Sequence, residues 1–187
     1  MKDKRFIINT FGCRANQADS SALRRSLREA GYEEVSSGEE ADLVIVNSCT
    51  VTHKSDQQVR QVTRKMRRRN PYARIVLTGC YAQRDPWVLA EKGLADLILG
   101  NRSKQGLLEI LDGGREDEAE INAGRVVWEE LAAEQSFNLE AGYPGEGQTR
   151  PQMKIQDGCS AACTYCIVPT VRGPSRSVPP AQVLDGV

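Results

Sequence analysis

Four short apolar runs alternate with helical patterns over the first 111 residues, and this alternation constrains the fold more than any other feature of the sequence. The apolar runs predict strands at 5–9, 42–47, 74–78 and 95–99. The intervening patterns predict helices at 17–30, at 55–69, from about residue 86, and at 104–111. Strands that alternate with helices form a parallel sheet covered on both faces. The predicted fold class is therefore α/β, with an open, mostly parallel sheet and flanking helices.

The remaining residues divide into two stretches of different character. Residues 112–149 are rich in glycine and acidic side chains and predict an acidic interdomain connection, in which 126–128 can pair as an edge strand. Residues 150–156 predict a new strand, and 180–187 predict the start of a helix. This is about one strand–helix unit, whereas a closed α/β barrel takes ~200–250 residues. The second domain, residues 150–187, is therefore expected to be incomplete.

The cysteines are expected to work in a reducing compartment. The first residues lack the apolar run of a signal peptide, and no stretch approaches the ~18 apolar residues of a membrane span. We therefore expect a cytoplasmic protein without membrane contact, in which the six cysteines bind metal or perform chemistry rather than form disulfides. Lys+Arg and Asp+Glu are both 25, so net charge indicates no partner. The single histidine, His53, nearly excludes mixed Cys/His zinc sites and looks incidental.

Three cysteines occupy equivalent places, because each follows an apolar run. We call Cys13, Cys49 and Cys80 the strand-end trio. Parallel strands point the same way, so these thiols are expected along the sheet edge where such folds bind ligands. Three thiolates there suit an iron–sulfur cluster with one unligated iron, and Gly12 and Gly79 let the backbone approach a bulky group. The alternatives are buried cysteines that serve only as small hydrophobes, a redox trio, and a zinc site that lacks its fourth ligand.

The other three cysteines, Cys159, Cys163 and Cys166, are spaced C-x3-C-x2-C, and we call them the loop trio. One short loop with this spacing can supply three of the four ligands of a cubic cluster. The unligated iron can then bind the amino and carboxylate groups of S-adenosylmethionine, whose carbon–sulfur bond breaks when the cluster donates one electron. A helix with three cysteines on one face is disfavoured by the flanking Gly158 and Pro169. A zinc knuckle would need a fourth ligand nearby.

Cations crowd the end of the second predicted helix and the turn after it. We call this group the basic patch; its members are Arg60, Arg64, Lys65, Arg67, Arg68, Arg69 and Arg74. RNA phosphates attract such a patch, and arginines also stack on bases. The alternative is a solvated helix face, because cations are favoured near a helix carboxyl end in any case.

Taken together, these pieces resemble the methylthiotransferase family of radical S-adenosylmethionine enzymes over nearly the whole chain. The matching stretches are GCRANQ (12–17), NSCTVT (47–52), TGC (78–80), the loop at 157–166 and RGPSRS (172–177). The resemblance implies an amino-terminal methylthiotransferase cluster domain over 5–111, then the first strand–helix unit of a radical S-adenosylmethionine α/β barrel. It also implies that the loop trio holds the radical-generating [4Fe–4S] cluster, with Tyr165 near S-adenosylmethionine, and that the strand-end trio holds an auxiliary [4Fe–4S] cluster carrying the sulfur to be inserted.

The implied activity is methylthiolation. Cys49–Thr52 and Asn16-Gln17 are most similar to the branch that modifies C2 of N6-threonylcarbamoyladenosine beside the tRNA anticodon. Other branches act on isopentenyladenosine in tRNA or on a ribosomal protein. The resemblance implies a monomer that uses tRNA and an electron donor such as a flavodoxin or ferredoxin, and residues 1–187 are expected to be inactive alone. The alternative from another class is a non-catalytic iron–sulfur or zinc-binding scaffold that docks on RNA.

Overall fold

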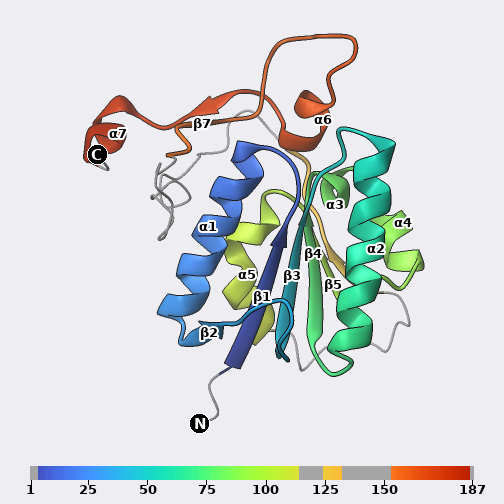
Figure 1. Ribbon diagram of the computed structural model, residues 1–187. Coiled ribbons are helices and arrows are strands. Elements are labelled where there is room, and N and C mark those ends of the chain that lie inside the picture. The colour runs from blue at the N-terminus through green and yellow to red at the C-terminus, as the bar shows by residue number, and fades with distance from the viewer. Residues whose placement is uncertain (1–3, 114–123, 132–152, 186–187) are drawn as a thin grey trace.

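The computed structural model describes residues 4–113, 124–131 and 153–185. Its centre is a six-stranded sheet in the order β2-β1-β3-β4-β5-β6, in which all pairs of neighbours are parallel (Figure 1). The strands are β1 (Lys4–Thr10), β2 (Tyr32–Glu34), β3 (Leu43–Ser48), β4 (Arg74–Gly79), β5 (Leu97–Leu99) and β6 (Arg125–Val127). The predicted α/β class with a parallel sheet is therefore confirmed.

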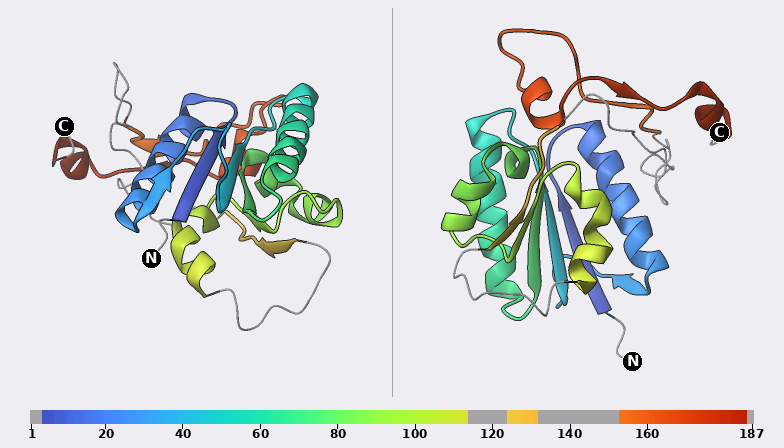
Figure 2. Two further views of the ribbon diagram at one scale, coloured as in Figure 1. Left: turned by 60° about the horizontal axis from the view of Figure 1, so that its bottom comes forward. Right: turned by 180° about the vertical axis from the view of Figure 1, so that it is seen from behind.

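Both faces of the sheet are covered by helices, which explains why its central strands are apolar without interruption. The helices are α1 (Arg14–Glu29), α2 (His53–Arg69), α3 (Cys80–Arg84), α4 (Pro86–Glu91) and α5 (Leu107–Asp112). Helices α1 and α5 lie on one face, and α2, α3 and α4 on the other (Figures 1 and 2). Along β3, Val44 and Val46 pack in the cluster that contains Val59 of α2, whereas Ile45 packs with Leu27 of α1.

The helix boundaries follow local signals with small shifts. Helix α2 begins where the Thr52 side chain accepts a hydrogen bond from Ser55 N (3.1 Å), which satisfies one of the free N–H groups of the first turn. Helix α1 starts three residues before the predicted position. The predicted helix at 104–111 is wrong in its first turn, which is a 3₁₀ helix, η1 (Ser103–Gly106), followed directly by α5.

The strand order reverses between β1 and β3, because β2 returns to the far side of β1. Strand β2 has no counterpart among the predicted strands, since its three residues (YEE) are polar and lie at an edge of the sheet. Strand β6 pairs with β5 as the opposite edge, one residue before the predicted position at 126–128. Open parallel sheets bind ligands beyond the carboxyl ends of the strands where the order reverses, so the crevice between β1 and β3 is the expected ligand position.

The carboxy-terminal segment, residues 153–185, lies across the carboxyl edge of the sheet (Figure 1). It contains β7 (Gln156–Asp157), α6 (Val168–Arg172), β8 (Arg176–Ser177) and α7 (Pro180–Asp185). The predicted strand at 150–156 is wrong for 153–155, which are irregular; only its last residue, Gln156, is in a strand, and that strand, β7, pairs antiparallel with β8. Residues 150–152, most of the predicted connection at 112–149, and the last two residues lie outside the described ranges. Within those ranges, no helix has the length and apolar character to cross a membrane.

Candidate functional site

The strand-end trio lies at the carboxyl ends of three adjacent strands, as predicted. Cys13 precedes the first turn of α1 after β1, Cys49 follows β3 directly, and Cys80 begins α3 at the end of β4. Because β3 pairs with both β1 and β4, the three cysteines share one edge, and Cys13 and Cys49 flank the point where the strand order reverses. Cys13 is exposed, whereas Cys49 and Cys80 are buried.

Both glycines beside the trio are required by close packing of the backbone. Gly12 has φ +97°, and a Cβ there would lie 2.7 Å from Cys49 Cβ and 2.8 Å from Cys49 Sγ. Gly79 has φ +92°, and a Cβ there would lie 2.4 Å from the carbonyl oxygen of Ser48. The close neighbours are therefore the chain's own atoms around Cys49 and β3, which is a different reason for these glycines than the approach of an inorganic group.

Two buried asparagines hold the loops of this edge together. Asn16 Nδ2 donates to the carbonyl oxygens of Phe11 (2.6 Å) and Ser48 (2.9 Å), and so joins the loop after β1 to the end of β3. Asn47 Nδ2 donates to Asn16 O and to Ser20 Oγ, both at 2.9 Å. Cys80 Sγ lies 3.9 Å from Asn16 Oδ1. In the sequence, Asn16 and Asn47 are distinguished only as parts of family motifs, although each asparagine contacts the backbone of the loops beside the cysteines.

The described residues contain no preformed metal site, because no group of three or more His, Cys, Asp or Glu side chains is arranged to hold a metal ion. The donor set at the carboxyl edge nevertheless fits an iron–sulfur cluster in its chemistry. It offers three thiols on adjacent strand ends, and thiolates are the usual ligands of such clusters. If a cluster binds there, Cys13, Cys49 and Cys80 are the residues that would hold it.

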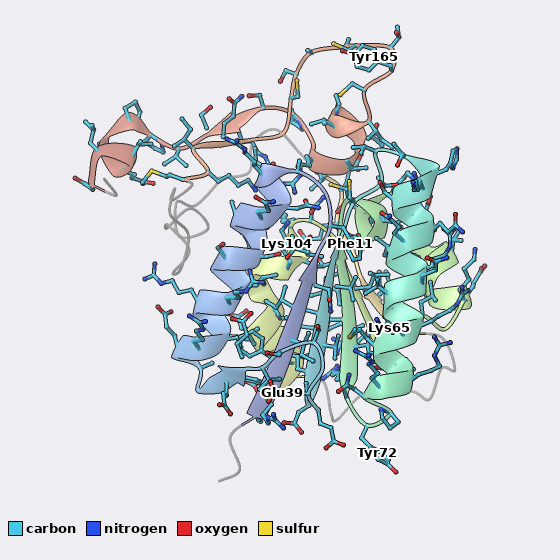
Figure 3. The ribbon with its side chains drawn as sticks, viewed as in Figure 1. Phe11, Glu39, Lys65, Tyr72, Lys104 and Tyr165 are labelled. Atoms are coloured by element: carbon cyan, nitrogen blue, oxygen red, sulfur yellow. The ribbon has the colours of Figure 1, made fainter. Side chains whose placement is uncertain are left out.

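The loop trio is irregular rather than helical, as predicted. The loop leaves β7 through Gly158 (φ +76°), where a Cβ would lie 2.1 Å from the carbonyl oxygen of Pro174. Cys159 N donates to Gly173 O (3.0 Å), and Cys166 N donates to Cys163 O (3.1 Å) in the turn that carries Tyr165. Cys163 is exposed and Tyr165 is 91% exposed, at the outer end of the loop (Figure 3). Cys163 is therefore accessible to a ligand arriving from outside the sheet, whereas Cys159 and Cys166 are partly buried.

A buried ion network joins this loop to the sheet. Asp19 of α1 accepts from Lys104 Nζ (2.6 Å), Lys154 Nζ (2.6 Å) and Arg172 Nη2 (2.8 Å). Asp157 accepts from the same Lys154 (2.9 Å) and from Arg172 Nη1 (2.9 Å). The side chains of all five residues are 10% exposed or less. No sequence pattern predicts this network, because its members are isolated charges far apart in the chain.

The network holds its carboxylates in the ionised form. Burial alone raises the pKa of Asp19, but the charges of Lys104, Arg172 and Lys154 together lower it well below the usual 3.8. The pKa of Asp157 is likewise lowered, because Arg172 and Lys154 outweigh burial. Burial lowers the pKa of Lys104 to about 8, since the attraction of Asp19 is opposed by the other two cations. With Arg176, whose Nη2 lies 3.7 Å from Asp157 Oδ2, four cations share two carboxylates, and the positive charge is in excess.

The structure separates the members of the basic patch into two groups. Arg60 Nη1 donates to the Tyr81 hydroxyl (2.7 Å), and Arg67 forms an ion pair with Asp96 (2.6 Å). These two guanidinium groups are bound within the protein, and Arg69 and Arg74 also donate to backbone carbonyl oxygens. Arg69 is exposed as well, but of the exposed members only Arg64, Lys65 and Arg68 have neither an ion pair nor a side-chain hydrogen bond to a described residue.

The exposed cations lie far from the cysteines. Helix α2 starts at the carboxyl edge of the sheet and runs back toward the opposite edge, and Lys65 lies on its distal half (Figure 3). At 1.5 Å per residue, Arg64 and Arg68 are about 17 and 23 Å along the axis from the start of α2. The same nucleotide therefore cannot contact both this surface and the cysteines.

Comparison with known proteins agrees with this architecture. Residues 5–100 match the family model described as "Uncharacterized protein family UPF0004". The threonylcarbamoyladenosine tRNA methylthiotransferase MtaB of Aquifex aeolicus is 40% identical over 181 residues, which are 96% of this chain and 43% of that protein. The protein of the same name from Bacillus subtilis is 35% identical, over 95% of this chain and 38% of its own length. A tRNA-2-methylthio-N(6)-dimethylallyladenosine synthase of Aquifex aeolicus is 35% identical over 98% of this chain and 42% of its own length.

The fold and its matches define an α/β domain of the kind found in methylthiotransferases. The chain belongs to the UPF0004 family, and the predicted resemblance to methylthiotransferases, including the threonylcarbamoyladenosine branch, is confirmed. The chain spans about two fifths of the length of these curated relatives.

Proposed function

We propose that this chain is part of a tRNA methylthiotransferase that places a methylthio group on C2 of N6-threonylcarbamoyladenosine next to the anticodon. The observation that carries the proposal is the position of the strand-end trio at the carboxyl ends of β1, β3 and β4, together with a second three-cysteine loop over the same edge. The relatives named for this reaction support it.

In this proposal the two trios bind one [4Fe–4S] cluster each, and S-adenosylmethionine binds at the cluster of the loop trio. When bound, the clusters supply the electron for cofactor cleavage and the sulfur for insertion. The chain's own residues supply the thiolates and fix their positions. Asn16 and Asn47 hold the loops of the strand-end trio, and Tyr165, which is exposed, is the residue that we expect to contact the cofactor.

We further propose that Arg64, Lys65 and Arg68 contact tRNA phosphates away from the modified nucleoside. Replacing all three with glutamine is expected to weaken tRNA binding and to reduce the slope of log K against log salt by about 2–3, since each phosphate contact contributes about 0.7–0.9. Arg28→Gln is the control, because Arg28 pairs with Glu34 on the opposite face of the sheet. An unchanged salt slope in the triple variant would show that this surface does not bind RNA.

The test of the reaction uses the full-length protein, reconstituted with iron and sulfide without oxygen. We expect about eight irons per chain, from two cubic clusters, and methylthiolated nucleoside in tRNA. Cys80→Ala is expected to abolish methylthiolation but to retain cleavage of S-adenosylmethionine, whereas Cys163→Ala abolishes both. His53→Ala, at the exposed first residue of α2, is the control and should retain both activities.

Two other outcomes would redirect the proposal. Stoichiometric zinc in place of iron, with RNA binding but no cofactor cleavage, would support the non-catalytic scaffold instead. Methylthiolation of isopentenyladenosine or of a ribosomal protein would retain the chemistry and change the substrate. Residues 1–187 alone are expected not to turn over, because a closed barrel takes ~200–250 residues, so activity of that piece would contradict this expectation.

A further inference from the structure

The ion network described above brings together residues from two parts of the chain. Asp19 and Lys104 belong to the sheet domain, in α1 and η1, whereas Lys154, Asp157 and Arg172 belong to the segment that carries the loop trio. Arg172 is the last residue of α6, and Asp157 lies two residues before Cys159. Lys154 and Arg172 therefore both pair with one buried carboxylate of the sheet domain, that of Asp19.

Burying five charged groups between two parts of a protein carries a large desolvation penalty. Apolar side chains of similar size often stabilise as well or better, whereas removing one partner of a buried ion pair is strongly destabilising. Such a network is therefore poorly explained as a general source of stability. It does differ from an apolar contact in requiring one geometry, because each carboxylate oxygen must face particular donors.

The network also connects the two cysteine trios through a short series of contacts. Arg172 Nη2 donates to Asn16 Oδ1 as well as to Asp19, and that same Asn16 oxygen lies 3.9 Å from Cys80 Sγ. Through Nη1 the same guanidinium binds Asp157, next to Gly158 and Cys159. Asn101 adds a second link, because its Nδ2 donates to the carbonyl oxygen of Val171 (2.5 Å) and lies 3.9 Å from Cys80 Sγ.

We propose that Asp19 is a positioning residue that fixes the loop trio relative to the strand-end trio. It acts through its ion pairs with Lys154 and Arg172. The inference rests on the proposed function only in treating both trios as cluster sites, since the docking of the loop is a property of the protein without clusters.

The first test measures amide hydrogen exchange in the full-length protein before iron is added. Asp19→Asn is expected to speed exchange in residues 154–178 by roughly 100-fold, because it leaves three buried cations with one carboxylate. Exchange in β1, β3 and β4 should remain slow. Asp56→Asn is the matched control, because Asp56 is equally buried but pairs with Arg84 inside the sheet domain.

Arg172→Gln repeats the test from the other side of the contact and guards against a variant that does not fold. It is expected to give the same selective loss of protection in 154–178. If neither variant changes exchange there, the loop is held by other contacts and the proposal is wrong. If both variants lose protection in β1, β3 and β4 to the same extent, the network supports the fold in general, and the proposal is equally wrong.

The second test uses reconstituted protein and the magnetic coupling between the two reduced clusters. Asp19→Asn is expected to bind as much iron as the parent protein but to show a weakened or broadened coupling, because the distance between the trios is no longer fixed. Asp56→Asn should leave the coupling unchanged. If the parent protein forms no clusters, the proposed function fails, but the exchange experiment still decides the role of Asp19. An unchanged coupling in Asp19→Asn would refute the positioning role.

Discussion

Replacing Gly79 with alanine tests the packing that brings the ends of β3 and β4 together beside Cys80. Gly79 has φ +92° and ψ −163°, a conformation that residues with a side chain rarely adopt. An added Cβ would lie 2.4 Å from Ser48 O, 2.5 Å from Asn47 Oδ1 and 2.6 Å from Ser48 N. Two of these atoms are backbone atoms of a buried central strand, which cannot move away without disturbing its pairing.

The two effects give the expected size of the change. Backbone strain costs of order 1–3 kcal/mol, and overpacking in a closed interior adds about 1–3 kcal/mol. We therefore expect Gly79→Ala to lower the free energy of unfolding by about 2–6 kcal/mol. With a urea m-value of about 2 kcal/mol/M, the midpoint should fall by about 1–3 M.

The assay is urea denaturation followed by far-UV circular dichroism, with two glycine variants as controls. Gly93 has φ +58° with nothing within 4 Å of an added Cβ, so Gly93→Ala should cost only the strain of about 1–2 kcal/mol. Gly38 also has open space and no positive φ, so Gly38→Ala should change little. A midpoint for Gly79→Ala within about 0.5 M of that for Gly93→Ala, at the same m-value, would refute the argument from close packing.

Three further predictions concern the core, a helix cap and the ion network. Leu77→Ala should lower the free energy of unfolding, measured with urea, by about 2–5 kcal/mol, because Leu77 is fully buried. A smaller loss than that caused by Leu184→Ala, at an exposed position, would contradict this prediction. Thr52→Ala should cost about 1 kcal/mol and Thr52→Ser much less, since the hydroxyl accepts from Ser55 N; equal losses would exclude a capping role. Because the folded-state pKa of Asp19 lies below the usual 3.8, the unfolded chain binds more protons in acid, and stability should fall as pH drops below 3.8. In Asp19→Asn, the free energy of unfolding should depend less on pH below 3.8. An unchanged pH dependence would show that Asp19 does not contribute to it.

The amino-acid pattern alone determined the parallel sheet and the place of the strand-end trio. Within the predicted strand at 42–47, residues 43–46 are apolar without interruption because helices cover both faces of β3, and this property can be read locally. Parallel strands then bring the residues after them to one edge, so the shared position of Cys13, Cys49 and Cys80 followed from chain order. The flanking glycine and proline likewise indicated that the loop trio is not helical.

Only the tertiary structure decided which strands are neighbours, which cations are free and how the two cysteine trios are connected. Strand β2 gives no apolar pattern, so the reversal of strand order between β1 and β3 could not be predicted. Arg60 and Arg67 resemble Arg64 in the sequence but are bound to Tyr81 and Asp96, which lie 21 and 29 residues away. The contact between Arg172 and Asp19 spans 153 residues. Such pairings depend on how the whole chain packs, because an isolated charge carries no local signal of the partner it will meet.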